Sequence, residues 1–182
     1  MTIYDLKDLR DFRDFKDLRD LKDFKDFKLL NNITTMPKEK DKIQKTNVAR
    51  LMDKAKIAYE LIPYEVDESN LAAEHVAEQL GENIEQVFKT LVLRGDKTGL
   101  FVCVIPGNFE VDLKIAAKIS GNKNSQMLHV KELLPNTGYI RGGCSPIGMK
   151  KPFPTFIHES ALLHDYIYIS AGVRGLQIKI AP

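Results

Sequence analysis

The pattern of apolar and polar residues divides the chain into three parts. From Asp5 to Lys28, the triplet Asp, then Leu or Phe, then Lys or Arg repeats eight times. An α-helix advances about 100° per residue, so apolar positions three residues apart spiral around it and form no apolar face. A half-buried strand needs a period of two, which this repeat also lacks. We therefore expect residues 1–30 to be a low-complexity leader, disordered or loosely helical, followed by a polar linker over residues 31–45.

Two further hypotheses concern this N-terminal part. The repeat could serve as an oligomerisation or partner-binding tail, and its acidic and basic residues balance, so it adds nothing to the net charge. Met36 within the linker could be the biological start. Peptides from upstream of Met36, detected by mass spectrometry of the native protein, would contradict that second hypothesis.

Residues 46–182 show the mixed periodicities of a folded domain. Helices are expected after Thr46, after Ser69 or Asn70 as the capping residue, and after Asp112, with Gly81 and Gly121 ending the last two. Shorter helical turns are expected at residues 131–134 and near residues 161–162. Strands are expected at residues 59–66, 87–94, 100–106, 127–129, 155–158, 166–170 and 176–180.

The strongest of these elements is a hairpin formed by residues 87–94 and 100–106, with a turn at residues 95–99. Pro63 places the strand at residues 59–66 on the edge of its sheet, because proline cannot donate to a strand ladder. Strands and helices follow one another without strict alternation. The order predicts an α+β fold, with a curved, mainly antiparallel mixed sheet and surrounding helices.

Composition narrows the function classes. The 182 residues suit one ordinary domain, and 43% hydrophobic and 29% charged residues are typical of a soluble protein. A net charge of +2 excludes a uniformly basic nucleic-acid coat but not a local basic patch. The sequence shows no membrane span, no signal peptide and no metal-ligand spacing, and its two cysteines are too few for a disulfide framework. We expect a reducing, cytoplasmic setting.

The segment from Gly142 to Gly148 is the most unusual stretch of the domain. It holds three glycines, Cys144 and a proline within seven residues. Glycine permits positive φ and close approach of a ligand, so the segment could cradle a ligand with backbone N–H groups. It could equally be a tight connection between two strands. Lys89 is a second unusual residue, because it lies in an apolar strand, either at the strand end facing water or at the rim of a pocket.

No common catalytic motif accompanies these features. Cys144 could act as a nucleophile with a histidine as its base, but no spacing ties it to His129, His158 or His164. Cys103 lies in a continuous apolar run and is expected to be an inert core thiol. The remaining groups are a lysine, backbone N–H groups and hydroxyls. Such a set can orient and polarise an acyl group without a protein nucleophile.

Several strings occur together in a characteristic order: Val-Phe-Lys-Thr-Leu at residues 87–91, Thr-Gly-Tyr-Ile-Arg-Gly-Gly-Cys-Ser-Pro-Ile-Gly at 137–148, Lys-Lys at 150–151, Pro-Thr at 154–155, and Tyr-Ile-Ser-Ala-Gly-Val-Arg-Gly-Leu at 168–176. In these strings the chain resembles the YbaK-type Cys-tRNA(Pro) deacylases. Their superfamily includes the editing domain of bacterial prolyl-tRNA synthetases. The resemblance covers about residues 46–182.

The resemblance implies a trans-editing enzyme that clears cysteine from mischarged Cys-tRNA(Pro), and also Cys-tRNA(Cys). Cysteine and proline are similar in size, so a binding pocket alone rejects the wrong one poorly and a second, hydrolytic sieve is needed. In the family, the substrate thiol is proposed to attack the aminoacyl ester and leave as a cyclic thiolactone. The implied partners are the acceptor end of tRNA(Pro) and prolyl-tRNA synthetase, and no cofactor or metal is implied.

The resemblance also assigns site residues. It implies catalytic roles for Lys89, Gly142 and Gly143, and substrate contacts for Tyr64, Thr90, Ser170 and Gln177. Gln177 stands where relatives carry an aspartate, so it can hydrogen-bond but cannot act as a base or hold an ammonium by charge. Cys144 stands where relatives usually carry an aliphatic residue, which favours a packing role.

Basic residues near these segments could contact tRNA phosphates, and each such contact would add to the salt dependence of binding. They are Lys114, Lys118, Lys123, Lys150, Lys151 and Arg174. Ordinary solvated lysines are the alternative at each position. Two alternatives to the main function also stay open: a non-catalytic module that binds aminoacyl-tRNA or a synthetase, and a deacylase with another amino-acid specificity.

Overall fold

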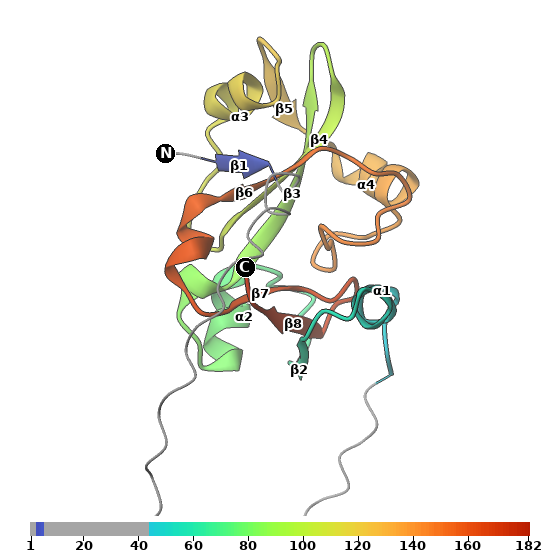
Figure 1. Ribbon diagram of the computed structural model, residues 1–182, viewed down its shortest axis with the longest axis vertical. Coiled ribbons are helices and arrows are strands. Elements are labelled where there is room, and N and C mark those ends of the chain that lie inside the picture. Colours follow the sequence, from blue (N-terminus) through green and yellow to red (C-terminus); the bar gives the residue numbers. More distant parts are fainter. Residues whose placement is uncertain (1–2, 6–43) are drawn as a thin grey trace, which may run out of the picture.

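The computed structural model describes residues 3–5 and 44–182 of the protein (Figure 1). The helices in this part of the chain are α1 (Asn47–Ala55), α2 (Ala73–Leu80), α3 (Leu113–Ile119) and α4 (Val130–Thr137), with short 3-10 turns η2 (Ile84–Gln86) and η3 (Glu159–Leu163). The strands are β1 (Ile3–Asp5), β2 (Glu60–Pro63), β3 (Phe88–Gly95), β4 (Gly99–Pro106), β5 (Ser125–Met127), β6 (Thr155–His158), β7 (Ile167–Ser170) and β8 (Leu176–Ile180).

Five strands form one sheet in the order β1-β6-β4-β3-β5. The predicted hairpin is confirmed: β3 and β4 pair from Phe88 opposite Pro106 to Gly95 opposite Gly99. β4 and β6 run parallel, and the other pairs run antiparallel. The α+β class with a mixed, mainly antiparallel sheet is therefore confirmed.

A second sheet contains β2, β8 and β7, which are all antiparallel. β2 lies at its edge, as Pro63 predicted. The two sheets meet where Val87 forms a single parallel bridge with Tyr168 of β7. The prediction of one curved sheet is thus corrected to two sheets around a common core, which includes Val48, Met52, Phe88, Val92, Val102, Val104, Ile167, Ile169 and Ile178.

Helix starts follow local hydrogen bonding, and two of the three predicted starts are confirmed. Asp112 caps α3, with its carboxylate accepting from the N–H groups of Lys114 and Ile115. Thr46 caps α1, with its hydroxyl oxygen accepting from the Ala49 N–H at 3.2 Å. α2 begins at Ala73 rather than directly after Ser69 or Asn70. The Asn70 side chain instead accepts from the Ala72 N–H at 3.2 Å, which closes a turn ahead of the helix.

The region before the glycine-rich loop also differs from its prediction. The short strand lies at Ser125–Met127, two residues earlier than expected. α4 continues through Pro135 to Thr137, although proline lacks the N–H that an inner turn of a helix uses. The helix ends at Gly138, whose φ of 85° is in the left-handed region.

The leader is described only at Ile3–Asp5, which form β1 and pair with β6. No strand was predicted in the leader, so β1 is a feature that the sequence analysis missed. The rest of the repeat, the linker through residue 43 and Met36 lie outside the described residues. The described helices include none that is both long and apolar enough to cross a membrane.

Candidate functional site

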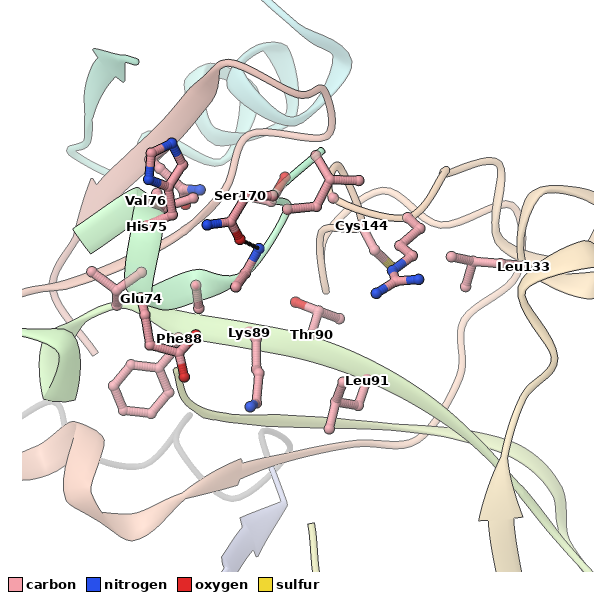
Figure 2. Close-up of a pocket in the computed structure, with 18 of the residues that line it drawn as sticks. Glu74, His75, Val76, Phe88, Lys89, Thr90, Leu91, Leu133, Cys144 and Ser170 are labelled. Atoms are coloured by element: carbon pink, nitrogen blue, oxygen red, sulfur yellow. Dashed lines mark hydrogen bonds between the residues drawn. The ribbon is translucent and has the colours of Figure 1, made fainter. Parts of the chain in front are cut away.

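A cavity of about 530 Å³ is lined by residues of both sheets. Its walls come from the segment between β2 and α2, the start of α2, residues 87–92, the segment from β5 to α4, the glycine-rich loop and the facing ends of β7 and β8 (Figure 2). The fold brings together six of the predicted site residues there: Lys89, Gly142, Tyr64, Thr90, Ser170 and Gln177. They come from β3, from β7 and β8, and from the segments after β2 and α4.

One edge of β3 is open where it borders the cavity. β4 covers the other edge along its full length, whereas β5 pairs only with the last three residues of β3. The unpaired stretch of this edge lies between two contacts. On one side is the bridge from Val87 to Tyr168, and on the other the Leu128 N–H donates to the Val92 carbonyl at 2.9 Å. Backbone groups point alternately to the two edges of a strand, so the N–H and C=O of Thr90 point to the same edge as the Val92 carbonyl.

Two buried polar atoms at the cavity lack hydrogen-bond partners among the described residues. They are the hydroxyl oxygen of Thr90 and the side-chain oxygen Oε1 of Gln177. Gln177 is only 6% exposed, so water reaches it poorly. A buried polar atom without a partner costs about 1–3 kcal/mol. A ligand that donates hydrogen bonds to these two oxygens would remove that cost.

Lys89 is held by a backbone carbonyl. Its Nζ donates to the carbonyl oxygen of Gly107 at 2.7 Å, and Gly107 directly follows β4. Figure 2 shows Lys89 and Thr90 extending from opposite sides of β3, as neighbouring residues of a strand do. The Thr90 side chain points toward Cys144 and Ser170, while the Lys89 ammonium lies on the other side of the strand.

The second sheet contributes hydroxyl and amide groups. Ser170 and Gln177 face each other across the β7–β8 ladder. The Ser170 hydroxyl oxygen accepts from the Gly172 N–H at 3.2 Å, a bond that does not use the hydroxyl proton. Tyr64 is fixed through its backbone N–H, which donates to the Gly175 carbonyl at 3.0 Å, and its side chain lines the cavity.

The glycine-rich loop connects α4 to β6, so the expectation of a tight connection between two strands was wrong. Gly142 has a φ of 82° and lines the cavity. Gly143 does not line it, and its N–H already donates to the Ile140 carbonyl at 3.0 Å. A Cβ on Gly143 would lie 3.1 Å from the backbone of Val173 and Arg174. Gly143 therefore allows two backbones to approach closely.

The two cysteines are buried and free. Burial raises the pKa of the Cys144 thiol to about 12, and it does the same for Cys103. Both thiols thus stay protonated near neutral pH, although Cys144 lines the cavity. Because the thiolate is the nucleophilic form, this geometry argues against Cys144 as an activated nucleophile.

The predicted tRNA-contact residues occupy two different faces. α3, which carries Lys114 and Lys118, packs its Ala116 on the sheet face that holds Leu93 and Phe101. The core shared with the second sheet lies against the opposite face of that sheet, which carries Val92, Val102 and Val104. α3 therefore lies across the sheet from the shared core. Lys123 follows α3, and its N–H donates to the Asp96 carboxylate at 3.0 Å.

The remaining basic residues lie near the glycine-rich loop. Lys150 donates to the carbonyls of Leu134 and Pro135 at 3.4 Å each, at the end of α4. Arg174 bonds to the Glu68 carboxylate at 3.2 Å and to the Arg141 carbonyl at 3.0 Å. Lys151 is exposed. None of these six predicted basic residues lines the cavity.

His75 and Arg141 are among the lining residues that were not predicted as site residues. His75 of α2 lines the cavity, and its Nε2 lies 2.8 Å from the Gln79 amide nitrogen, which donates to it. Gln79 also accepts the Glu65 N–H at 2.8 Å, which fixes the amide orientation. Arg141 lines the cavity from the start of the glycine-rich loop. A lone helical histidine carries no sequence signal that separates it from a surface residue, whereas Arg141 stands inside the family string at residues 137–148, which could have marked it.

Comparison with known proteins places this geometry in a family. Residues 67–182 match the family model described as aminoacyl-tRNA editing domain. A protein of Enterococcus faecalis, named "Putative Cys-tRNA(Pro)/Cys-tRNA(Cys) deacylase EbsC", is 55% identical over 139 residues, which cover 76% of this chain and 85% of that protein. A Bacillus subtilis protein named "Uncharacterized protein YwhH" is 26% identical over 118 residues, 65% of this chain and 74% of that one.

Solved structures share the fold at low sequence identity. One, described as hypothetical protein APE2540, gives a TM-score of 0.68 at 19% identity and covers 74% of this chain and 88% of that one. Another, described as "a putative trans-editing enzyme for prolyl tRNA synthetase", gives 0.60 at 23% identity, with 68% and 76% covered. The family model spans most of the described domain, and the Enterococcus relative matches at high identity. The chain therefore belongs to the aminoacyl-tRNA editing domain family.

Proposed function

We propose that this protein is an aminoacyl-tRNA deacylase that clears cysteine from mischarged Cys-tRNA(Pro). The observation that carries the proposal is the pair of unpartnered oxygens on Thr90 and Gln177, buried at one cavity. An aminoacyl ester offers an α-amino group and ribose hydroxyls, which are donors that such oxygens accept. Family membership and the name of the Enterococcus relative support the same activity.

The protonated state of Cys144 supports a reaction without a protein nucleophile. In the proposed step, the cysteinyl thiol loses its proton and its sulfur attacks the ester carbonyl. The carbon–oxygen bond to the tRNA ribose then breaks, the ribose oxygen takes a proton, and the cysteinyl group leaves as a cyclic thiolactone. The site needs only to orient the ester and stabilise the oxygen that becomes negative.

The described geometry supports a division of roles within this step. Gly142 lines the cavity and the Thr90 N–H points to the open strand edge, so both are candidates for stabilising the oxyanion. The engaged N–H of Gly143 favours a supporting role for that residue. Ser170, Tyr64 and Gln177 orient the aminoacyl group. The Lys89 ammonium supplies a cation near the tRNA end from the other side of β3, where it would exchange the Gly107 carbonyl for the substrate.

In this proposal, the protein also binds the acceptor end of tRNA(Pro) and prolyl-tRNA synthetase. Arg174 and Lys151 lie near the glycine-rich loop and would meet the acceptor end first. Lys114, Lys118 and Lys123 would meet only a larger partner, because α3 packs on the other face of the sheet. The synthetase would supply tRNA choice.

Single-turnover deacylation of labelled Cys-tRNA(Pro) tests the function. Wild type should release cysteine well above the uncatalysed rate, and Lys89→Ala should lower that rate about a hundredfold. Lys97→Ala, on the exposed β3–β4 turn, is a matched lysine control expected to match wild type. Background release by wild type would reject the enzyme and favour a non-catalytic binding module.

Substrate choice separates the cysteine-specific reaction from other deacylases. Ser-tRNA(Pro) places a hydroxyl where the cysteine thiol would be, and Ala-tRNA(Pro) removes the group entirely. The substrate-thiol mechanism predicts cleavage of the cysteinyl ester alone. Equal rates for all three aminoacyl groups would contradict that mechanism and indicate a deacylase of broader specificity.

A further inference from the structure

The segment between β2 and α2, residues 64–72, forms one wall of the cavity. Two neighbouring backbone N–H groups tie the start of this wall to the rest of the fold. The Tyr64 N–H donates to the carbonyl of Gly175, just before β8, at 3.0 Å. The Glu65 N–H donates to the side-chain oxygen Oε1 of Gln79 on α2 at 2.8 Å. The first bond uses backbone groups alone, whereas the second depends on how a side-chain amide is oriented.

The Gln79 amide passes its orientation on to His75, the cavity-lining histidine of α2. Because Oε1 accepts the Glu65 N–H, the amide nitrogen points the other way, and it lies 2.8 Å from His75 Nε2. An amide nitrogen can donate a hydrogen bond but cannot accept one. His75 Nε2 must therefore be the acceptor, so the neutral ring carries its single proton on Nδ1. One chain of hydrogen bonds thus runs from the Glu65 backbone through Gln79 to His75.

A second proton on His75 is incompatible with this chain. The imidazolium ring carries hydrogen on both nitrogens, so Nε2 can no longer accept from Gln79. Hydrogen bonds from a charged donor are the stronger ones, so the amide turns over and gives Oε1 to the ring. Its NH2 group then faces the Glu65 N–H, and two donors cannot bond to each other. The protonation state of His75 therefore decides whether the wall is tied to α2.

His75 is open to protonation from water. Its side chain is 27% exposed, and Glu78 Oε2 lies 3.9 Å from Nδ1 on the same helix. Asp67 stands in the wall, where hydrogen bonds from Ser69 lower the pKa of its carboxyl and the charge of His75 adds a smaller effect in the same direction. The other charged residues that line the cavity are Glu74, Lys89 and Arg141. In the view of Figure 2, Ser170 lies between His75 and Cys144.

We propose that Gln79 and His75 are positioning residues that form a pH-sensitive latch: the neutral imidazole holds residues 64–67 against α2, and its protonation releases them. Tyr64, which belongs to this stretch, lines the cavity and is a predicted substrate contact. Release would loosen the wall and weaken substrate binding as the pH falls. The effect on deacylation rests on the proposed function, whereas the latch itself is independent of it.

NMR of the histidine nitrogens in the full chain tests the latch without any reaction. Long-range proton–nitrogen spectra distinguish the two neutral tautomers, and the His75 signals are assigned by their loss in His75→Phe. At a pH above the titration of His75, wild type should carry the ring proton on Nδ1. Gln79→Glu should move it to Nε2, because a carboxylate offers only acceptors. A proton on Nε2 in wild type would overturn the latch.

The Glu65 amide reports whether the wall is tied to α2. As the pH falls through the titration of His75, exchange of the Glu65 N–H with water should rise about fivefold relative to that of the Tyr64 N–H. The Tyr64 bond involves no titratable group, so this neighbouring amide is the matched control. Gln79→Glu should abolish the change, because its two oxygens can accept from the Glu65 N–H and from His75 Nε2 together. Equal responses of both amides in wild type, or an undiminished Glu65 response in Gln79→Glu, would contradict the proposal.

Single-turnover deacylation of labelled Cys-tRNA(Pro) connects the latch to the reaction. The ratio of the wild-type rate to the Gln79→Glu rate cancels the pH dependence of the chemistry itself. This ratio should fall about threefold across the titration of His75, and a constant ratio would overturn the positioning role. An intact Glu65 response without any deacylation would reject the proposed function alone. Deacylation without a Glu65 response would reject the latch alone.

Discussion

The glycine-rich loop and β3 both border the cavity, but they differ in which hydrogen-bonding groups are left free. In the loop, the Gly143 N–H is bonded to the Ile140 carbonyl. The Tyr139 hydroxyl likewise donates to the Ile147 carbonyl at 2.6 Å. In β3, by contrast, the Thr90 hydroxyl has no partner in the described part of the chain, and its backbone points to an open edge.

This difference indicates a scaffold on one side and a binding surface on the other. Folded proteins satisfy nearly all buried polar groups, so a group left unsatisfied at a cavity is evidence for a ligand. The loop uses its glycines for close packing against Val173 and Arg174. The strand instead presents unused hydrogen-bonding groups between the residues that pair with β5 and the bridge from Val87 to β7.

The largest expected effect is on the alkylation rate of the Cys144 thiol, which lies in the glycine-rich loop. Burial raises its pKa from 9.0 to about 12, so its thiolate fraction near pH 8 should be lower about a thousandfold. Iodoacetamide should label Cys144 at least that much more slowly in the folded protein than in urea. The folded rate should rise about tenfold per pH unit below pH 12. Peptide mass mapping separates this site from Cys103, and fast labelling of folded Cys144 would contradict a packing role.

The second effect tests the loop as a scaffold. In Gly143→Ala, the new Cβ would lie 3.1 Å from the backbone of Val173 and Arg174, which cannot move as a side chain can. We expect the free energy of unfolding to fall by about 2 kcal/mol, as for other overpacked sites. Urea denaturation followed by circular dichroism measures it. An unchanged midpoint, with activity lost, would make the loop part of the reaction instead.

A pair of threonines gives the third effect. Thr90→Val removes a hydroxyl that has no partner among residues 3–5 and 44–182, so stability should hold or rise, while deacylation should fall about tenfold. Thr137→Val is the matched control in the segment leading to the loop, because the Thr137 hydroxyl donates to the Leu133 carbonyl at 2.7 Å and accepts from the Tyr139 N–H at 3.1 Å. That variant should lose about 1–2 kcal/mol of stability.

The threonine comparison fails if the two variants behave alike. Thr90→Ser keeps the hydroxyl and should retain most of the activity that Thr90→Val loses. Equal destabilisation in Thr90→Val and Thr137→Val would mean that the Thr90 hydroxyl has a structural partner, and the open edge of β3 would lose its role as the binding surface.

The smallest effect concerns Lys150, which lies at the end of α4. Its two contacts to the Leu134 and Pro135 carbonyls are long, at 3.4 Å, and exposed. Lys150→Ala should therefore lower the free energy of unfolding by about 0.5 kcal/mol. Lys151→Ala should leave it unchanged. If Lys150 instead contacts phosphate, its loss would reduce the salt dependence of tRNA binding while stability stays constant.

The sequence by itself determined the local elements and six of the residues that line the cavity. The β3–β4 hairpin, the Thr46 cap and the edge position of Pro63 follow from periodicity and from backbone chemistry that acts over a few residues. The family motifs predicted six residues that do line one cavity. These signals are local, so they survive without knowledge of the rest of the chain.

Only the tertiary structure decided which groups at the cavity remain free. The Gly143 N–H bonds within its own loop, to the Ile140 carbonyl. Whether the Thr90 hydroxyl has a partner depends instead on residues far away in the chain, and its backbone faces the gap along β3 between the pairing with β5 and the bridge to β7. The same holds for His75, which carries no local signal. Hydrogen-bond satisfaction is a property of the whole folded surroundings. For that reason the sequence named both the glycine-rich loop and two residues of β3, and the fold decided that the free groups lie on β3.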